Sequence, residues 1–140
     1  MVRSSGVAAP QSITTPSTTI IQRYFSEIEK IISEFPNIRF YTLTQKVYNN
    51  CQGCISGSIV FDNNHRLDFV EVKNTDLEHK IKYRYHYMDD RQEIIFRYDN
   101  APNHNHILTF PHHKHENNQI KPSNEPNLDE ILLEITQIQR

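Results

Sequence analysis

"KYRYHYMDDRQEIIFRYD", residues 82–99, is the stretch that most directly predicts the fold of this 140-residue chain. Aromatic and β-branched residues alternate with charged ones, which is the two-residue period of a strand with one buried face. Asp89 and Asp90 interrupt the alternation and mark a turn. The stretch therefore predicts an antiparallel hairpin.

The two faces of this hairpin differ in chemistry, because alternate residues point to opposite sides of a strand. The apolar face is expected to carry Tyr83, Tyr85, Ile94 and Phe96. The other face is expected to carry Lys82, Arg84, His86, Ile95 and Arg97. The sequence thus predicts one face that is buried and one that is basic.

Three similar runs, residues 39–48, 54–61 and 66–72, precede this hairpin, so we expect about five strands in a curved antiparallel meander. A turn at residues 63–65 would place Asp62 opposite Arg66. The same register turns Glu71 toward the apolar face, opposite Gly57. A carboxylate there must be paired, protonated or part of a site.

Amphipathic helices are expected at both ends of the sheet. Apolar residues recur at steps of three and four from Ile21 to Phe35, and again from Leu128 to Ile138 after a capping-box pattern at Asn127 and Glu130. The predicted fold is α+β, with an N-terminal and a C-terminal helix flanking the sheet. Residues 1–17 are rich in Ser, Thr, Pro and Ala and predict a flexible tail, which leaves residues 18–140 as one domain.

Overall composition does not call for a nucleic-acid or membrane partner. The formal net charge is -2, 23% of the residues are charged, and no apolar run approaches the roughly 20 residues that span a bilayer. We expect a cytoplasmic protein. Two cysteines make a disulfide framework improbable in that compartment.

Residues 100–126 form a long segment that is rich in histidine and proline, and we expect it to be irregular. Five histidines lie between positions 104 and 115. Imidazole both accepts and donates a proton near neutral pH, and RNA cleavage by the 2'-hydroxyl needs both steps together with cations that hold the phosphate. The candidates for the cations that hold the phosphate are Arg84, Arg97 and Lys114.

Several other readings stay open at this point. The histidine run could be a solvated loop, and the tyrosines could stack on unpaired bases or simply pack in the core. Pairs such as His113 with His115 suit a metal ion, and Cys51 with Cys54 could complete a zinc site. With three glycines and no phosphate-binding loop, nucleotide hydrolysis is not expected.

The stretch "FRYDNAPNHNHILTFPHHKH", residues 96–115, resembles the TumE family of bacterial and archaeal type II toxins. The matching pattern is Arg97, Tyr98, Asp99 and Asn100, then Pro102, His104 and His106, and then Thr109 to His115. Residues 56–72 are similar to a family hairpin that ends in a glutamate, here Glu71, and residues 82–87 to its aromatic strand. Cys51 and Cys54 are not part of this pattern.

The resemblance implies a toxin that is restrained by a cognate antitoxin, typically a small DNA-binding protein. We expect an endoribonuclease that works without metal or cofactor, with possible homodimerisation and no membrane partner. A toxin that modifies RNA by group transfer, a module that binds RNA or protein without turnover, and a structural zinc protein are the alternatives. An antitoxin with an acidic segment could cover the histidine and arginine face.

The residues expected to take part in chemistry are His112, His113, His115, Arg97 and Glu71. The residues expected to bind substrate are Arg84, Tyr85, His86, Asp99, Asn100, His104, His106 and Lys114.

Overall fold

The computed structural model describes residues 17–139, so that most of the predicted tail at residues 1–17 and also Arg140 lie outside the described residues. The helices are α1 (Ile20–Glu34) and α2 (Leu128–Ile138). The strands are β1 (Ile38–Val47), β2 (Gln52–Phe61), β3 (Arg66–Asn74), β4 (Lys82–Met88), β5 (Ile94–Asp99), β6 (His113–Glu116) and β7 (Gln119–Pro122).

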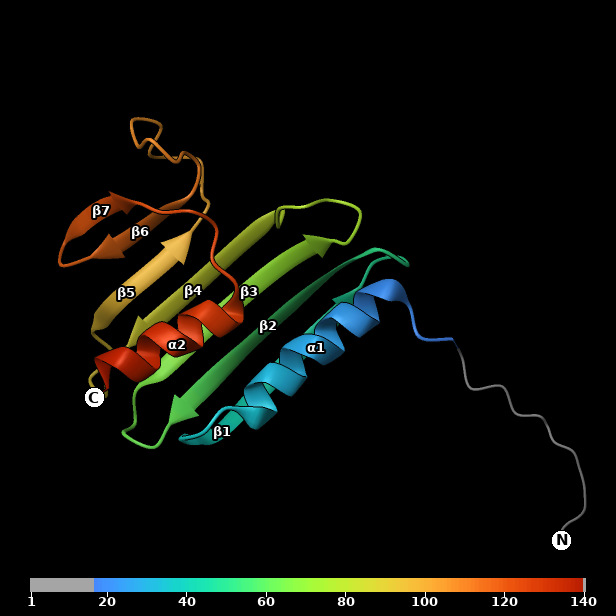
Figure 1. The fold of residues 1–140 in the computed structure, drawn as a ribbon, viewed down its shortest axis with the longest axis horizontal. Helices are drawn as coiled ribbons and strands as arrows, with labels where there is room; N and C mark the ends of the chain where they lie inside the picture. The colour runs from blue at the N-terminus through green and yellow to red at the C-terminus, as the bar shows by residue number, and fades with distance from the viewer. Residues whose placement is uncertain (1–16, 140) are drawn as a thin grey trace, which may run out of the picture.

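All seven strands form one antiparallel sheet in the order β1-β2-β3-β4-β5-β6-β7, so each strand pairs with its neighbour in the sequence. Figure 1 shows α1 and α2 lying on the same face of this curved sheet. The predicted α+β meander with two flanking helices is confirmed. The predicted number of about five strands is wrong, because β6 and β7 fall inside the segment that was expected to be irregular.

The β6–β7 hairpin was missed because its strands are short and polar. Its two-residue turn consists of Asn117 and Asn118, with φ angles of 55° and 59°. Positive φ at both central residues is the geometry of the primed turns that match the twist of a hairpin, and asparagine tolerates it well. The Asn-Asn pair was therefore the available sequence signal.

Helix capping follows the sequence patterns at both helices. Thr19 Oγ1 accepts a hydrogen bond from the Gln22 backbone N–H at 3.1 Å, and the Gln22 side chain accepts one from the Thr19 N–H at 2.9 Å. At the start of α2, the Glu130 carboxylate accepts a 2.8 Å hydrogen bond from the backbone N–H of Asn127. The caps fix where both helices begin.

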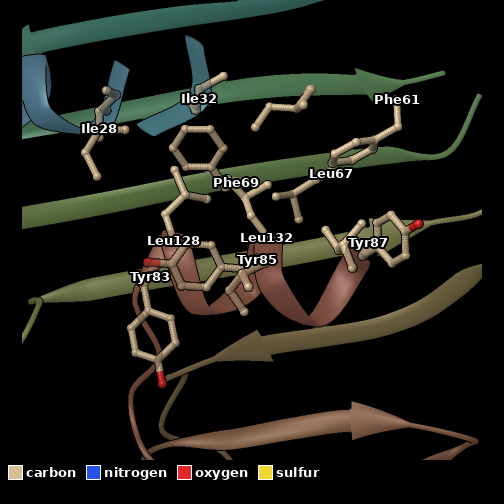
Figure 2. Packing of buried hydrophobic residues seen from close by; sticks show 14 of the residues in the cluster. Ile28, Ile32, Phe61, Leu67, Phe69, Tyr83, Tyr85, Tyr87, Leu128 and Leu132 are labelled. Atoms are coloured by element: carbon tan, nitrogen blue, oxygen red, sulfur yellow. The ribbon is translucent and has the colours of Figure 1, made fainter. Parts of the chain in front are cut away.

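The hydrophobic core lies between the sheet and the two helices (Figure 2). The helices contribute Ile21, Phe25, Ile28, Ile32, Leu128, Ile131, Leu132 and Ile135. The sheet contributes Ile55, Ile59, Phe61, Leu67, Phe69, Tyr83, Tyr85, Tyr87 and Phe96. The opposite face of β4, β5 and β6 carries mostly polar residues.

The β2–β3 register differs from the predicted one by two residues. Arg66 pairs with Val60 and Glu71 with Ile55, whereas Asp62 had been expected opposite Arg66. A shift of two residues keeps every side chain on its predicted face. Glu71 is accordingly buried, as predicted, but it does not face Gly57.

Ile94 does not reach the buried core, in contrast to the prediction that grouped it with Tyr83, Tyr85 and Phe96. The turn runs from Asp89 to Glu93, and a register irregularity separates Tyr87 from Met88 in the β4–β5 pair. Ile94 is consequently 49% exposed, while Phe96 is fully buried. The longer turn carries the start of β5 away from the core.

Candidate active site on the polar face

The register of four strands lines up side chains in a row across the polar face, which we call the Arg97 row. Asp68 on β3 pairs with His86 on β4, His86 pairs with Arg97 on β5, and Arg97 pairs with His115 on β6. Directly paired residues point to the same face of a sheet. The backbones of His86 and His115 are thus two strand spacings, roughly 10 Å, apart with the guanidinium between them.

A second row lies beside the first and is centred on Asp99. Arg84 pairs with Asp99, and Asp99 pairs with His113. The Asp99 carboxylate accepts hydrogen bonds from Arg97 Nε at 3.0 Å and from the Ala101 backbone N–H at 2.9 Å. It also lies 2.9 Å from His113 Nε2 and 3.5 Å from His115 Nε2. One buried carboxylate therefore connects both rows.

The loop between β5 and β6 brings a third imidazole to this place. The ring centroid of His104 lies 4.9 Å from that of His113 and 5.7 Å from that of His115. We call His104, His113, His115 and Asp99 the imidazole cluster. His106 lies 6.1 Å from His104, measured between ring centroids, on the exposed side of the loop and outside the cluster.

Burial affects the proton affinity of the histidines in the Arg97 row. It lowers the pKa of His86, and the positive charge of Arg97 lowers it further. Burial also lowers the pKa of His115, although the negative charge of Asp99 acts in the opposite direction. In both histidines, burial thus favours the neutral imidazole, which is the form that can accept a proton.

Two hollows border these rows. A pocket of about 440 Å³ is lined by Arg84, Arg97, Asp99 and Asn100 together with residues 81–83, 101 and 102. A larger hollow of about 690 Å³ touches the row only at His115 and otherwise follows the β6–β7 hairpin and the start of β5. Arginines line the smaller hollow, whereas the carboxylates of Glu93 and Glu116 line the larger one, so the smaller hollow is the better candidate for a phosphate.

His112, which was expected to act with His113 and His115, is separated from them by the alternation of the chain. Its Nδ1 lies 2.9 Å from the hydroxyl of Tyr83, and its ring stacks on that of Tyr83. It forms a different group with His79 and Glu125. Burial lowers the pKa of His112, against the effect of Glu125.

Lys114 was expected to contact substrate, but it projects toward the helices. Its ammonium group donates a 2.7 Å hydrogen bond to Glu134 on α2 and lies 5.0 Å from the centroid of the Tyr98 ring. Burial alone would lower the pKa of Lys114, but the contacts with Glu134 and Tyr98 more than offset this and raise it. This lysine joins β6 to α2.

Glu71 and Tyr85 lie on the core face, away from the histidines. The Glu71 carboxylate accepts 2.6 Å hydrogen bonds from the hydroxyls of Tyr24 and Tyr85. Neither Glu71 nor Tyr85 has exposed surface. Tyr85 is therefore a core residue and is inaccessible to bases. The carboxylate of Glu71 is paired, and its partners are two tyrosines.

The side chain of Asn100 is used by the backbone of β4. It accepts a 3.0 Å hydrogen bond from the Tyr83 N–H and donates one of 3.2 Å to the Ile81 carbonyl. Asn100 thereby extends the β4–β5 pairing by one step and forms part of the pocket wall.

The cysteines cannot complete a metal site with these histidines. Cys54 lies on β2 and Cys51 in the turn before it, and three strands separate β2 from β6 in the sheet. Within residues 17–139, neither cysteine belongs to a group of three potential ligands. The Cys₂His₂ alternative is therefore wrong.

The fold and the site define a class: a small α+β protein with a row of acid, base and cationic side chains on the open face of a meander sheet. The family model described as "Toxin TumE" matches residues 28–139. This is most of the chain, so the chain belongs to the toxin TumE family and is the toxin component of a toxin–antitoxin system, with a cognate antitoxin as its partner. No curated protein and no solved structure matches the chain. Among the described residues, no helix is long and apolar enough to cross a membrane.

Proposed function

We propose that the chain is an endoribonuclease and that the scissile phosphate of the RNA lies over Arg97, between His86 and His115. The observation that carries this proposal is the Arg97 row, in which an imidazole lies on each side of a guanidinium on one polar face. A phosphate held there would have a proton acceptor on one side and a proton donor on the other.

In the proposed reaction, one imidazole takes the proton of the 2'-hydroxyl as the 2'-oxygen forms a bond with phosphorus. The bond between phosphorus and the 5'-oxygen breaks, and the second imidazole, in its protonated form, gives its proton to the leaving 5'-oxygen. The products are a 2',3'-cyclic phosphate and a 5'-hydroxyl. Water is not consumed in this step, and the net number of protons is unchanged.

The arginines have different roles in this proposal. Arg97 is hydrogen-bonded to Asp99 through Nε at 3.0 Å, which leaves the outer nitrogens of its guanidinium for the phosphorane oxygens. Arg84 is exposed on β4 and lines the same pocket, so it would bind a neighbouring phosphate. Asp99 and His113 are buried and act by positioning Arg97 and His115.

His86 takes the place that had been expected for His113. His113 is only 1% exposed, whereas His86 and His115 are half-buried and border the polar face. A group that exchanges protons with RNA must reach it, which favours His86 and His115.

The test is cleavage of a labelled RNA by the purified full chain in EDTA, with single His86→Gln, His115→Gln and Arg97→Gln variants. Each variant should lose roughly 100- to 10,000-fold in kcat, because each removes one proton transfer or one cation at the phosphorane. His79→Gln is the matched control, because His79 is exposed and lies outside both rows.

Product ends separate the competing activities. A cyclic phosphate end supports the proposal, whereas a mass increase of intact RNA would indicate group transfer. Growth arrest with unaltered RNA would indicate a binding module. Either of the last two results would refute cleavage.

We also infer that the cognate antitoxin covers the polar face with an acidic segment. Arg84, His86 and Arg97 form a basic surface there, and a carboxylate-rich segment would occupy the phosphate positions. Competitive inhibition of RNA cleavage by the purified antitoxin would support this, and undiminished RNA binding in the complex would refute it.

A further inference from the structure

We propose that the imidazole cluster binds one transition-metal ion, with Zn²⁺ as the best-matched candidate, and that the bound ion holds the toxin inactive. The ligands are His104, His113 and His115, with Asp99 as the fourth. The inhibitory part of this proposal rests on the proposed function, because it needs His115 to transfer a proton. The binding part does not depend on it.

The strongest observation is the hydrogen bonding of the His113 ring, which fixes its tautomer. Its Nδ1 lies 2.9 Å from the carbonyl oxygen of Pro111, and a carbonyl can only accept, so Nδ1 carries the hydrogen. In the neutral ring the lone pair is therefore on Nε2. A backbone carbonyl that fixes the tautomer in this way is the usual outer partner of a metal-bound histidine.

His113 Nε2 is buried and lacks a hydrogen-bond partner in the part of the chain that the structure describes. It lies 2.9 Å from Asp99 Oδ1, but this contact is poorly aligned for a hydrogen bond. A buried nitrogen without a partner is costly, and a carboxylate beside its lone pair adds repulsion. A cation between the two atoms would remove both costs.

The separations of the donor atoms suit a common ion. Two ligands that are each about 2.0 Å from a tetrahedral zinc lie roughly 3.3 Å from one another. Asp99 Oδ1 lies 2.9 Å from His113 Nε2, and the other oxygen of the same carboxylate, Oδ2, lies 3.5 Å from His115 Nε2. One ring nitrogen from each of the three histidines lies within 4.8 Å of the others, so these three form a ligand group by themselves. Asp99 borders this group through His113 and His115, and its carboxylate would have to turn toward the ion to complete the shell.

The pairing of β5 with β6 explains why these side chains lie close to one another. His113 and His115 are two residues apart on β6 and therefore share a face, and Asp99 is the direct partner of His113 on β5. Three of the four ligands are thus fixed on neighbouring strands. His104 comes from the β5–β6 loop, and a bound ion would tie that loop to the sheet.

Four protein ligands would fill a tetrahedral shell, which is typical of structural zinc sites, whereas catalytic sites keep one position open for water. The ion would also take the His115 lone pair that the proposed proton transfer needs. Occupancy should therefore suppress RNA cleavage. Arg97 donates to Asp99 through Nε, so the ion and the guanidinium would share this carboxylate.

A second group of potential ligands, His79, His112 and Glu125, is less suited to an ion. The Lys80 ammonium lies 3.5 Å from Glu125 and already supplies a positive charge there. His79 is 66% exposed. This group therefore provides a matched histidine control.

The experiment uses the full chain after removal of metal with a chelator, followed by calorimetric titration with ZnCl₂. Wild type should bind one equivalent, His104→Gln should bind at least roughly tenfold more weakly, and His79→Gln should bind as wild type does. His104 lies on a loop, so its substitution leaves the sheet intact. Far-ultraviolet circular dichroism checks the fold of each variant.

RNA cleavage is then measured over a range of ZnCl₂ concentrations. Zinc should suppress wild-type cleavage at the concentration where it binds, EDTA should restore cleavage, and His104→Gln should need at least tenfold more zinc. Failure of wild type to bind one equivalent, or unchanged binding by His104→Gln, would overturn the site. Stimulation of cleavage by zinc would overturn the inhibitory role.

The two proposals fail separately. If the chain cleaves no RNA under any condition, the calorimetric titration still decides whether the imidazole cluster binds zinc. If zinc does not bind, cleavage in EDTA still decides whether the Arg97 row is catalytic.

Discussion

The hydroxyl of Tyr85 donates a 2.6 Å hydrogen bond to the carboxylate of Glu71, and both side chains are completely inaccessible to solvent. Tyr24 on α1 donates a second bond of the same length. The pair thus connects β3, β4 and α1 across the core, on the side of the sheet opposite the proposed site. It is a structural element and gives a direct test of what holds the fold together.

Replacement of Glu71 by Ala should lower the free energy of unfolding by roughly 2–4 kcal/mol, because it leaves two tyrosine hydroxyls without an acceptor. Glu71→Gln should cost less, because its amide oxygen can still accept one of the two bonds. Urea unfolding followed by circular dichroism measures both variants. An unfolding midpoint of Glu71→Ala equal to that of wild type would contradict this assignment.

Alkaline pH should weaken the same connection. Burial, and then the negative charge of Glu71, raises the pKa of both Tyr24 and Tyr85 well above the usual value of 10. The folded chain retains these two protons at a pH where the unfolded chain releases them, so their contribution to stability is complete below pH 10 and falls as the pH rises further. Unfolding titrations at several alkaline pH values would measure this loss. Tyr24→Phe with Tyr85→Phe should flatten the dependence, and an equally steep loss in that double variant would count against it.

Lys114 should contribute to the stability of the folded chain and should contribute little to RNA cleavage. Lys114→Met removes the ammonium group that bonds Glu134 at 2.7 Å, and a partly exposed pair of this kind is worth about 1–2 kcal/mol. Thermal unfolding would register the loss, with Glu134→Gln as the matched partner variant. Because the side chain lies on the helix face, the folded Lys114→Met protein should cleave RNA at close to the wild-type rate. A large loss of cleavage with unchanged stability would place Lys114 in the site after all.

Arg84 should contribute to RNA affinity through one phosphate. Arg84→Gln should raise KM more than it lowers kcat, and should reduce the slope of log affinity against log salt by about one. Arg39 on β1 is a matched control, because it lies at the far edge of the sheet. Equal salt slopes for wild type and Arg84→Gln would exclude a phosphate contact at this position.

The turn at Asn117 and Asn118 should be sensitive to side-chain shape. Asn118→Val places a β-branched residue at a φ angle of 59° and should cost about 1–2 kcal/mol, whereas Asn118→Gly should be neutral or stabilising. Comparison of the two unfolding midpoints measures the difference. Because the turn fixes β6, Asn118→Val should also weaken the alignment of His115 with Arg97, and its cleavage rate should fall with it.

Long patterned segments made most of the fold predictable from the sequence. Both helices carry a continuous apolar stripe and a capping pattern, and β2 to β5 alternate over six or more residues. The face of Glu71 was predicted correctly even though its cross-strand partner was not, because a register error of two residues preserves the face. The four-residue strands β6 and β7 carry too few apolar residues for periodicity to detect them.

The chemistry of the site was partly predictable for the same reason. Alternation on β4 and β5 correctly put Arg84, His86 and Arg97 on one face. Because β6 was not predicted as a strand, the sequence could not show which face of the sheet each of His112, His113 and His115 lies on. The structure separates His112 and Lys114 from His113 and His115, and no local pattern distinguishes the loop residue His104 from His106.

The order of pairing in the sheet also determines at what stage of synthesis the proposed site can form. Each strand joins its sequence neighbour, so the sheet needs few distant contacts and can grow as the chain leaves the ribosome. The residues of the polar face, however, run from Asp68 to His115, and β6 is held by β7 and α2 behind it. On the proposed mechanism, a chain that ends before β6 would lack His113 and His115, so the proposed site forms only after β6 has been made and paired.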